Sequence, residues 1–223
     1  MTTSVKAVVT DIEGTTSSIT FVHEVLFPYA RERLAGFIAR NRDALAALLD
    51  EVRAAEGGSD LEEAAVVAAL RRWIDEDRKA TPLNTLQGMI WRYGYESGEL
   101  TAHVYDDVAP ALRRWHGRGL RLFVYSSGSV GAQQLLFAHS VAGDLTPLFE
   151  AYFDTRVGAK TDTGSYGRIA AAIGLPPAEI LFLSDAPAEI AAARAAGLKA
   201  VRLARDGQAV AGDVASFDEI SVI

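Results

Sequence analysis

Two carboxylates stand close together near the start of the chain, directly after a short apolar run. The stretch VVTDIEGTT places Asp11 and Glu13 two residues apart, followed by a glycine and two threonines. Taken alone, such a pair is most simply interpreted as solvated acids at the end of a strand. Two acids on one turn would also suit phosphoryl transfer, in which one carboxylate attacks phosphorus and the other exchanges protons with the leaving oxygen and with water. In that interpretation Asp11 is the nucleophile and Glu13 is the general acid and base.

Three further groups could serve the same chemistry. The run SSGS, Ser126–Ser129, offers hydroxyls and backbone N–H groups to a phosphate, although serine and glycine also form ordinary turns and helix caps. Asp185 in SDAPAE could share one Mg²⁺ with Asp11, since this cation prefers oxygen ligands and commonly takes only one or two carboxylates. Capping the next helix is the alternative role of Asp185. Lys160 would add a positive charge for phosphate, although a lone lysine is usually solvated.

Short apolar runs lie just before the two acid-containing stretches and the serine run. Together with a fourth run later in the chain, they predict buried strands at Ala7–Thr10, Leu120–Tyr125, Ile180–Leu183 and Ala200–Leu203. Helical patterns separate the last three runs, so the fold class is α/β, with a doubly wound, Rossmann-like parallel sheet. Ligands of such sheets bind beyond the carboxyl ends of the strands, where the candidate residues stand.

Residues 17–100 differ from the rest, because they show four apolar stripes of helical spacing and almost no strand pattern. We interpret them as a helical cap domain inserted after the first strand. The core domain is then residues 1–16 and 101–223. We assign Phe27, Met89 and Trp91 to the core of the insertion, since apolar residues at helical spacing are core more often than ligand contacts.

The amino-acid composition limits which kinds of partner the protein can have. The 223 residues carry a net charge of −7, include no cysteine and contain no basic block. Nucleic acid and anionic membranes are therefore not expected partners, and no run approaches the roughly 20 apolar residues that span a bilayer. Disulfide and thiolate chemistry are excluded. We expect a cytoplasmic monomer that acts on a small phosphomonoester.

These motifs together resemble the haloacid dehalogenase-like superfamily of hydrolases. Its pattern is an Asp-x-Asp-x-Thr loop, a serine or threonine after the second core strand, a lysine and a late acidic loop. Here it stands as DIEGT, SS, Lys160 and SD. Glu13 replaces the usual second aspartate of that pattern. With this glutamate and longer stretches such as TPLNTLQGMIWRYGYESGEL and YFDTRVGAK, the chain resembles the enolase-phosphatase family of methionine salvage.

The resemblance implies a substrate, a cofactor and a set of site residues. The substrate would be 2,3-diketo-5-methylthiopentyl-1-phosphate, which is enolised and then dephosphorylated to an acireductone with one Mg²⁺ per chain. The metal positions would be Asp11, Glu13 (through its backbone carbonyl) and Asp185, and the residues that bind the substrate phosphate would be Ser126, Ser127 and Lys160. The insertion would be the family's cap.

Several alternatives remain open at this point. The runner-up activity is that of a general small-metabolite phosphatase of the same superfamily. A non-catalytic metal- or phosphate-binding module and a dehalogenase that needs no Mg²⁺ are the other candidates. The base that enolises the substrate is not identified, and Glu13 and a cap residue are both candidates for it.

Overall fold

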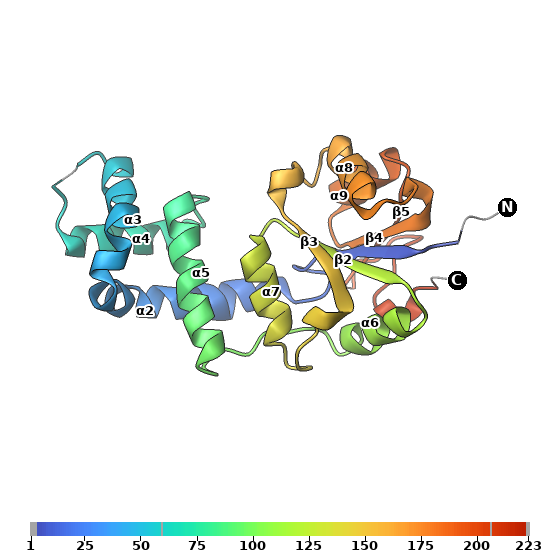
Figure 1. Cartoon of the computed structure of the whole chain (residues 1–223), viewed down its shortest axis with the longest axis horizontal. Helices are drawn as coiled ribbons and strands as arrows, with labels where there is room; N and C mark the ends of the chain where they lie inside the picture. The colour runs from blue at the N-terminus through green and yellow to red at the C-terminus, as the bar shows by residue number, and fades with distance from the viewer. Residues whose placement is uncertain (1–3, 59, 206, 222–223) are drawn as a thin grey trace. The chain divides into compact units, whose positions relative to one another are not determined.

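The computed structural model of the protein describes residues 4–58, 60–205 and 207–221. The chain forms two compact units (Figure 1), one made of Met1–Ile19 and Thr101–Ile223 and the other of Thr20–Leu100. We call the first the α/β unit and the second the helical unit. None of the helices in this described part of the chain is long and apolar enough to span a bilayer.

A five-stranded parallel sheet forms the centre of the α/β unit, in the order β3-β2-β1-β4-β5. The strands are β1 (Ala7–Thr10), β2 (Arg121–Tyr125), β3 (Phe149–Phe153), β4 (Ile180–Ser184) and β5 (Lys199–Arg202). The register sets Thr10 at the end of β1 beside Val124 of β2 and Leu183 of β4. The residues that leave these three strands therefore emerge at one edge of the sheet. The expected α/β fold with a parallel sheet is confirmed.

Strand β3 was not expected from the sequence. It lies at the edge of the sheet and pairs only with β2, and of its residues only Phe149 is buried. Glu150 is exposed and binds Arg121 of β2 at 2.7 Å. Glu150 stands inside FEAYF, so this strand lacks a continuous apolar run.

Helices cover both faces of the sheet. They are α6 (Val108–Gly117), α7 (Val130–Ala138), α8 (Thr163–Ile173) and α9 (Pro187–Ala195). Helices α8 and α9 pack on the face that carries Tyr125 and Phe182, and the ring of Tyr166 from α8 lies 5.0 Å from that of Phe182. Helix α6 packs against β2 and α7 beside β3. Gly174 ends α8 with a left-handed φ of 76°, a common conformation for a glycine just after a helix.

Four long helices build the helical unit, as the four stripes predicted. They are α2 (Phe27–Arg40), α3 (Arg42–Ala55), α4 (Glu63–Asp75) and α5 (Thr81–Glu96), preceded by the short α1 (Ile19–Phe21) and a π-helical turn, Val22–Leu26. The core of the unit comprises Leu34, Ile38, Leu45, Leu49, Val66, Leu70, Trp73, Leu86 and Ile90, all at most 2% exposed.

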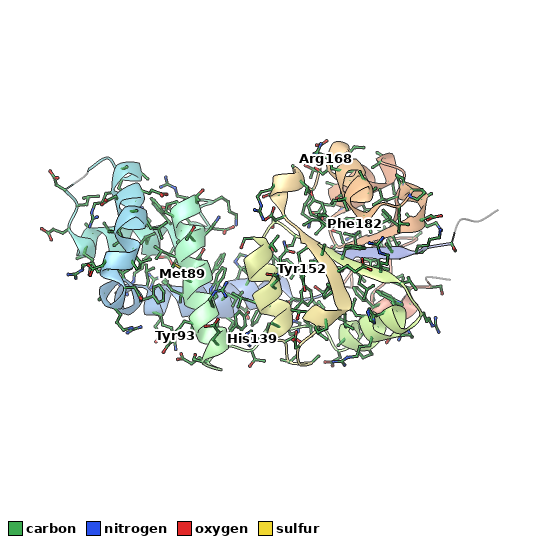
Figure 2. All side chains as sticks on the ribbon, in the orientation of Figure 1. Met89, Tyr93, His139, Tyr152, Arg168 and Phe182 are labelled. Atoms are coloured by element: carbon green, nitrogen blue, oxygen red, sulfur yellow. The ribbon has the colours of Figure 1, made fainter. Side chains whose placement is uncertain are left out.

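One assignment within this unit is wrong. Met89 is 42% exposed, and Tyr93, one turn further along α5, is 50% exposed (Figure 2). Helix α5 is apolar on more than one side, and it buries Leu86, Ile90 and Gly94 instead. Trp91 and Phe27 are half-buried with their rings stacked 6.4 Å apart. The indole N–H of Trp91 donates to the carbonyl of Leu26 at 2.8 Å, so this pair closes the edge of the core.

Candidate active site

Two acidic loops meet at the carboxyl edge of the sheet. Asp11 follows β1, and its N–H donates to the carbonyl of Leu183 at 2.9 Å, which ties it to the end of β4. Asp185 follows β4 directly. Ser126 follows β2 on the other side of β1. The topology thus brings three of the predicted site residues to adjacent strand ends.

The DIEGTT stretch folds into a closed turn. The carbonyl of Ile12 accepts the N–H groups of Thr15, Thr16 and Ser17 at 3.2, 2.9 and 2.9 Å. Gly14 has a left-handed φ of 70°, and a Cβ at this position would collide with the carboxylate of Asp185. Only glycine meets both requirements without strain. The carboxylate of Asp185 therefore lies directly against the turn that carries Asp11 and Glu13.

Lys160 lies in the same cluster. Its Nζ is 2.6 Å from Oδ1 of Asp11 and 2.8 Å from Oε2 of Glu189, and its side chain is 10% exposed. Its loop is held by two buried tyrosines. The hydroxyl of Tyr166 donates to the carbonyl of Lys160 at 2.6 Å, and that of Tyr125 donates to the carbonyl of Gly158 at 3.0 Å.

Glu189 was given no role in the sequence analysis. It lies in the first turn of α9, and besides the ammonium of Lys160 it accepts a hydrogen bond from Oγ of Ser184 at 2.7 Å. The sequence contains one signal for it, an acid four residues after Asp185. An acid in the first turn of a helix is also favoured by the helix dipole alone, so that signal does not separate the two roles.

The electrostatics of the cluster follow from burial. Burial raises the pKa of Asp11 to about 7; the Lys160 ammonium opposes this rise and the Glu189 carboxylate adds to it. Burial, and then Glu189, also raise the pKa of Asp185. Burial alone would lower the pKa of Lys160, but the Asp11 and Glu189 carboxylates outweigh it and raise that pKa. The cluster favours added positive charge, because each change reduces its net negative charge.

This donor set fits Mg²⁺. Asp11, Asp185 and Glu189 against Lys160 carry a formal charge of −2 when ionised, which one divalent cation would balance. Asp11 and Asp185 offer carboxylate oxygens, the ligand type that Mg²⁺ prefers. No cluster of three or more histidine, aspartate or glutamate side chains arranged for a metal occurs in the described ranges. The expected set has only two such side chains, since Glu13 is assigned through its backbone carbonyl.

The three serines of the SSGS run have different surroundings and roles. Ser126 is buried, its N–H donates to the carbonyl of Phe153 at 3.2 Å, and its Oγ accepts the N–H of Gly128 at 3.4 Å. Ser127 is exposed. The cap of α7 is Ser129, whose Oγ accepts the N–H of Ala132 at 3.3 Å. Within this run, Ser129 is therefore the helix cap, and Ser126 and Ser127 are not.

Asp185 does not cap α9 either. The N-cap position of that helix is Ala186, which makes no side-chain capping bond. The N–H of Ala186 donates to Oγ of Ser184 at 3.1 Å. The structural alternative for Asp185 is thus excluded, and its carboxylate faces the Gly14 turn.

The chain is similar to known proteins over most of its length. The profile of the haloacid dehalogenase-like hydrolases matches residues 5–197. The chain is 60% identical over 205 residues to enolase-phosphatase E1 of Parvibaculum lavamentivorans, covering 91% of this chain and 87% of that protein. It is 54% identical over 221 residues to enolase-phosphatase E1 of Methylococcus capsulatus, covering 97% of each.

A solved structure of related sequence shows the same fold. The crystal structure of the UTR4 protein of Saccharomyces cerevisiae superimposes with a TM-score of 0.80 at 32% identity, covering 95% of this chain and 96% of that one. The family profile spans most of the chain, and the bacterial relatives are more than half identical over nearly all of it. The chain therefore belongs to the enolase-phosphatase E1 family of haloacid dehalogenase-like hydrolases.

Proposed function

We propose that this protein is a Mg²⁺-dependent enolase-phosphatase of methionine salvage and that its chemistry takes place at the carboxyl edge of β1 and β4. It would enolise 2,3-diketo-5-methylthiopentyl-1-phosphate and hydrolyse the phosphomonoester to give an acireductone. Family membership supports the substrate. The observation that carries the chemistry is the contact of 2.6 Å between Nζ of Lys160 and Oδ1 of Asp11, beside a second carboxylate, Asp185, that lies against the Asp11 turn.

Asp11 would be the nucleophile. Its carboxylate attacks phosphorus, the ester oxygen leaves with a proton from Glu13, and an aspartyl-phosphate forms. Glu13 then takes a proton from water, the water oxygen attacks phosphorus, and phosphate leaves with Asp11 restored. Lys160 favours the ionised form of Asp11 and stabilises charge on the phosphoryl oxygens. Ser126 and Ser127 would bind those oxygens from the end of β2.

The metal would be held by the carboxylates of Asp11 and Asp185 and by the backbone carbonyl of Glu13. Bound there, Mg²⁺ supplies the positive charge that offsets the repulsion between a carboxylate nucleophile and a phosphate dianion. Glu189 would keep Lys160 in place through its contact of 2.8 Å. We further propose that residues 17–100 are the family's cap and that the protein is a cytoplasmic monomer.

The test is a substrate panel with the purified full chain. We expect Mg²⁺-dependent release of phosphate and formation of an acireductone from the diketone phosphate, and slow turnover of common sugar phosphates. Asp11→Asn should abolish phosphate release, because an amide is not a nucleophile towards phosphorus. Fast turnover of sugar phosphates with none of the diketone would refute the substrate assignment in favour of a general phosphatase. Full activity of Asp11→Asn would refute the mechanism.

A further inference from the structure

Two arginines at and just after the end of β5 each donate to a backbone carbonyl of an acidic loop. Nε and Nη2 of Arg205 donate to the carbonyl of Thr15, in the Asp11 turn, at 3.1 and 2.9 Å. Nε of Arg202, the last residue of β5, donates to the carbonyl of Asp185 at 3.0 Å. The same short segment of chain thus contacts both loops that carry the proposed metal ligands.

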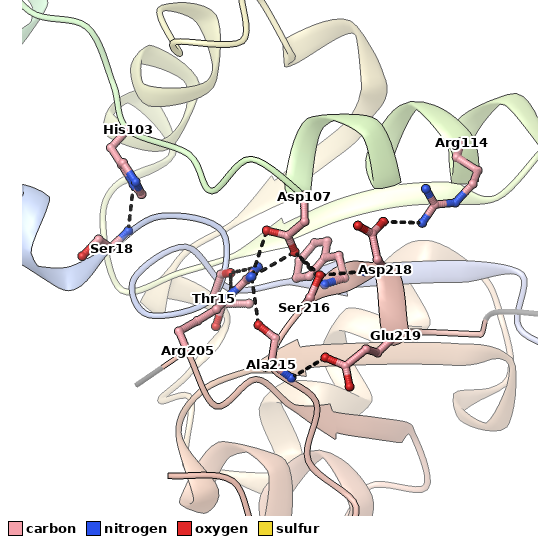
Figure 3. A network of polar contacts seen from close by, with 11 residues as sticks. Thr15, Ser18, His103, Asp107, Arg114, Arg205, Ala215, Ser216, Asp218 and Glu219 are labelled. Atoms are coloured by element: carbon pink, nitrogen blue, oxygen red, sulfur yellow. Dashed lines mark hydrogen bonds and ion pairs between the residues drawn. The ribbon is translucent and has the colours of Figure 1, made fainter. Parts of the chain in front are cut away.

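The guanidinium of Arg205 is held on every side (Figure 3). Its Nη1 donates to both carboxylate oxygens of Asp107, at 2.9 Å each, and to the carbonyl of Ala215 at 3.1 Å. It lies 4.3 Å from the ring centroid of Tyr105 and 5.3 Å from that of Phe217. Its side chain is 10% exposed. A planar guanidinium with all three nitrogens engaged has one orientation, so Arg205 offers Thr15 a fixed pair of donors.

Asp107 is itself held by hydrogen bonds from a segment near the C-terminus. Its Oδ2 accepts the N–H of Phe217 at 2.6 Å and the hydroxyl of Ser216 at 3.1 Å (Figure 3). Its own side chain is 14% exposed. Asp107 therefore links Arg205 to residues 215–217, and the support of the Asp11 turn extends to the far end of the sequence.

Arg202 has a parallel arrangement. Its Nη1 donates to Oδ2 of Asp213 at 2.9 Å, and the same oxygen accepts the N–H of Val210, also at 2.9 Å. The N–H of Val214 donates to the carbonyl of Arg202 at 3.0 Å. Each arginine thus pairs with one aspartate through Nη1 and donates to one acidic loop through Nε.

The carbonyl of Thr15 is a sensitive point of the Asp11 turn. The peptide N–H groups of Thr15 and Thr16 both donate to the carbonyl of Ile12. A rotation of the Thr15–Thr16 peptide would break the turn that brings Gly14 against Asp185. Two charge-assisted bonds from a fixed guanidinium oppose such a rotation.

We propose that Arg205 and Arg202 are positioning residues that hold the Asp11 and Asp185 loops at the mutual distance needed to bind Mg²⁺. The inference rests on the proposed function only in assigning the metal to these loops. Neither arginine touches substrate or metal in this scheme; each acts through a carbonyl. Loss of an outer partner of this kind typically costs about 10- to 100-fold in metal affinity or activity.

Arg194 provides a matched control. Its Nε and Nη2 donate to the carbonyl of Ala200 at 3.3 and 2.8 Å, which joins α9 to β5. It makes the same number and kind of bonds as Arg205 makes to Thr15, but to a carbonyl outside both acidic loops. Arg194→Ala therefore measures the structural cost of losing such a pair of bonds.

The experiment titrates the full chain with Mg²⁺ alone by calorimetry and records thermal unfolding of the same samples. We expect Arg205→Ala to weaken Mg²⁺ binding by about 10- to 100-fold and Arg194→Ala to leave it unchanged. Added guanidinium ion should restore part of the affinity of Arg205→Ala, because it can occupy the space that the side chain vacates beside Tyr105 and Phe217. Arg205→Lys keeps the charge but loses the fork, and we expect weakened binding from it too.

Unchanged Mg²⁺ affinity in Arg205→Ala, or an equal loss in Arg194→Ala, would overturn the proposal. If Arg205→Ala does not fold, Arg205→Lys decides it on the same measure. Phosphate release from the diketone by the wild-type chain is recorded separately. Failure of that reaction alone would count against the proposed function, while the Mg²⁺ comparison would still decide the role of Arg205.

Discussion

Replacing Asp11 with asparagine should stabilise the metal-free protein at neutral pH while it abolishes turnover. Burial raises the pKa of Asp11 from 3.8 to about 7, so the folded state binds this proton more tightly than the unfolded state. Its contribution to stability is then fully present below about pH 4 and is lost as the pH rises to about 7. One pKa unit corresponds to 1.36 kcal/mol, so the loss reaches up to about 4 kcal/mol.

The assay is denaturant unfolding in the presence of a chelator, at about pH 5 and about pH 8. The free energy of unfolding of Asp11→Asn should rise relative to wild type between these values, because the amide does not titrate. Lys160 retains Glu189 as a partner at 2.8 Å in this variant. Saturating Mg²⁺ should remove the penalty in wild type, since the metal binds the ionised carboxylate.

Asp144→Asn is the control. Hydrogen bonds from the hydroxyl and the N–H of Thr146 hold the pKa of Asp144 below its usual range, so this acid is ionised at both pH values. Its replacement should change stability by the same amount at each. If Asp11→Asn showed the same pH dependence as wild type, the argument that burial dominates the titration of Asp11 would be refuted.

Three further substitutions test other parts of the site. Gly14→Ala should cost about 1–2 kcal/mol for the left-handed φ and weaken Mg²⁺ binding, because the new Cβ displaces the Asp185 carboxylate; unchanged calorimetric affinity would contradict this. Glu189→Gln removes a charge that raises the pKa of Asp11, so the acidic limb of the pH profile of kcat should move to lower pH. A move to higher pH would show that another contact of Glu189 has the larger effect on the pKa of Asp11. Tyr166→Phe loses the bond of 2.6 Å to the carbonyl of Lys160; we expect about 1 kcal/mol less stability and a lower kcat, and an unchanged kcat would show that Lys160 needs no such support.

The sequence predicts those parts of the fold that leave a one-dimensional pattern. Strands β1, β2 and β4 lie inside the sheet and were found from continuous apolar runs, and the edge strand β5 was found from the run Ala200–Leu203. Strand β3, at the other edge, was missed because Glu150 interrupts its apolar residues. Met89 was wrongly assigned to the core because α5 has apolar residues on several sides, and periodicity alone does not choose among them. Which side is buried depends on the neighbouring helices.

Some residues of the candidate site could likewise be predicted from the sequence, and others could not. Asp11 and Asp185 could be placed together in advance, since both follow buried parallel strands and such strands end at one edge. Glu189 could not, because its role depends on the side chain of Lys160, which reaches it from a loop 29 residues away along the chain. The neighbouring residues in PAEIAAARAAG do not distinguish a glutamate that binds Lys160 from one that only interacts with the helix dipole.

The role of Arg205 is the hardest part of the site to predict from a sequence pattern. Its partner at Thr15 is a backbone carbonyl 190 residues earlier in the chain, and a carbonyl is present at every residue, so no residue type marks the contact. Only the orientation of one peptide, set by the turn around Ile12, makes that oxygen a target for the fork. Pattern reasoning therefore finds the groups that perform chemistry by their type, whereas the groups that position them are recognised by geometry. If Arg205→Ala and Arg194→Ala behaved alike, that distinction would fail for this chain, and the predicted acids and lysine would suffice to explain the site.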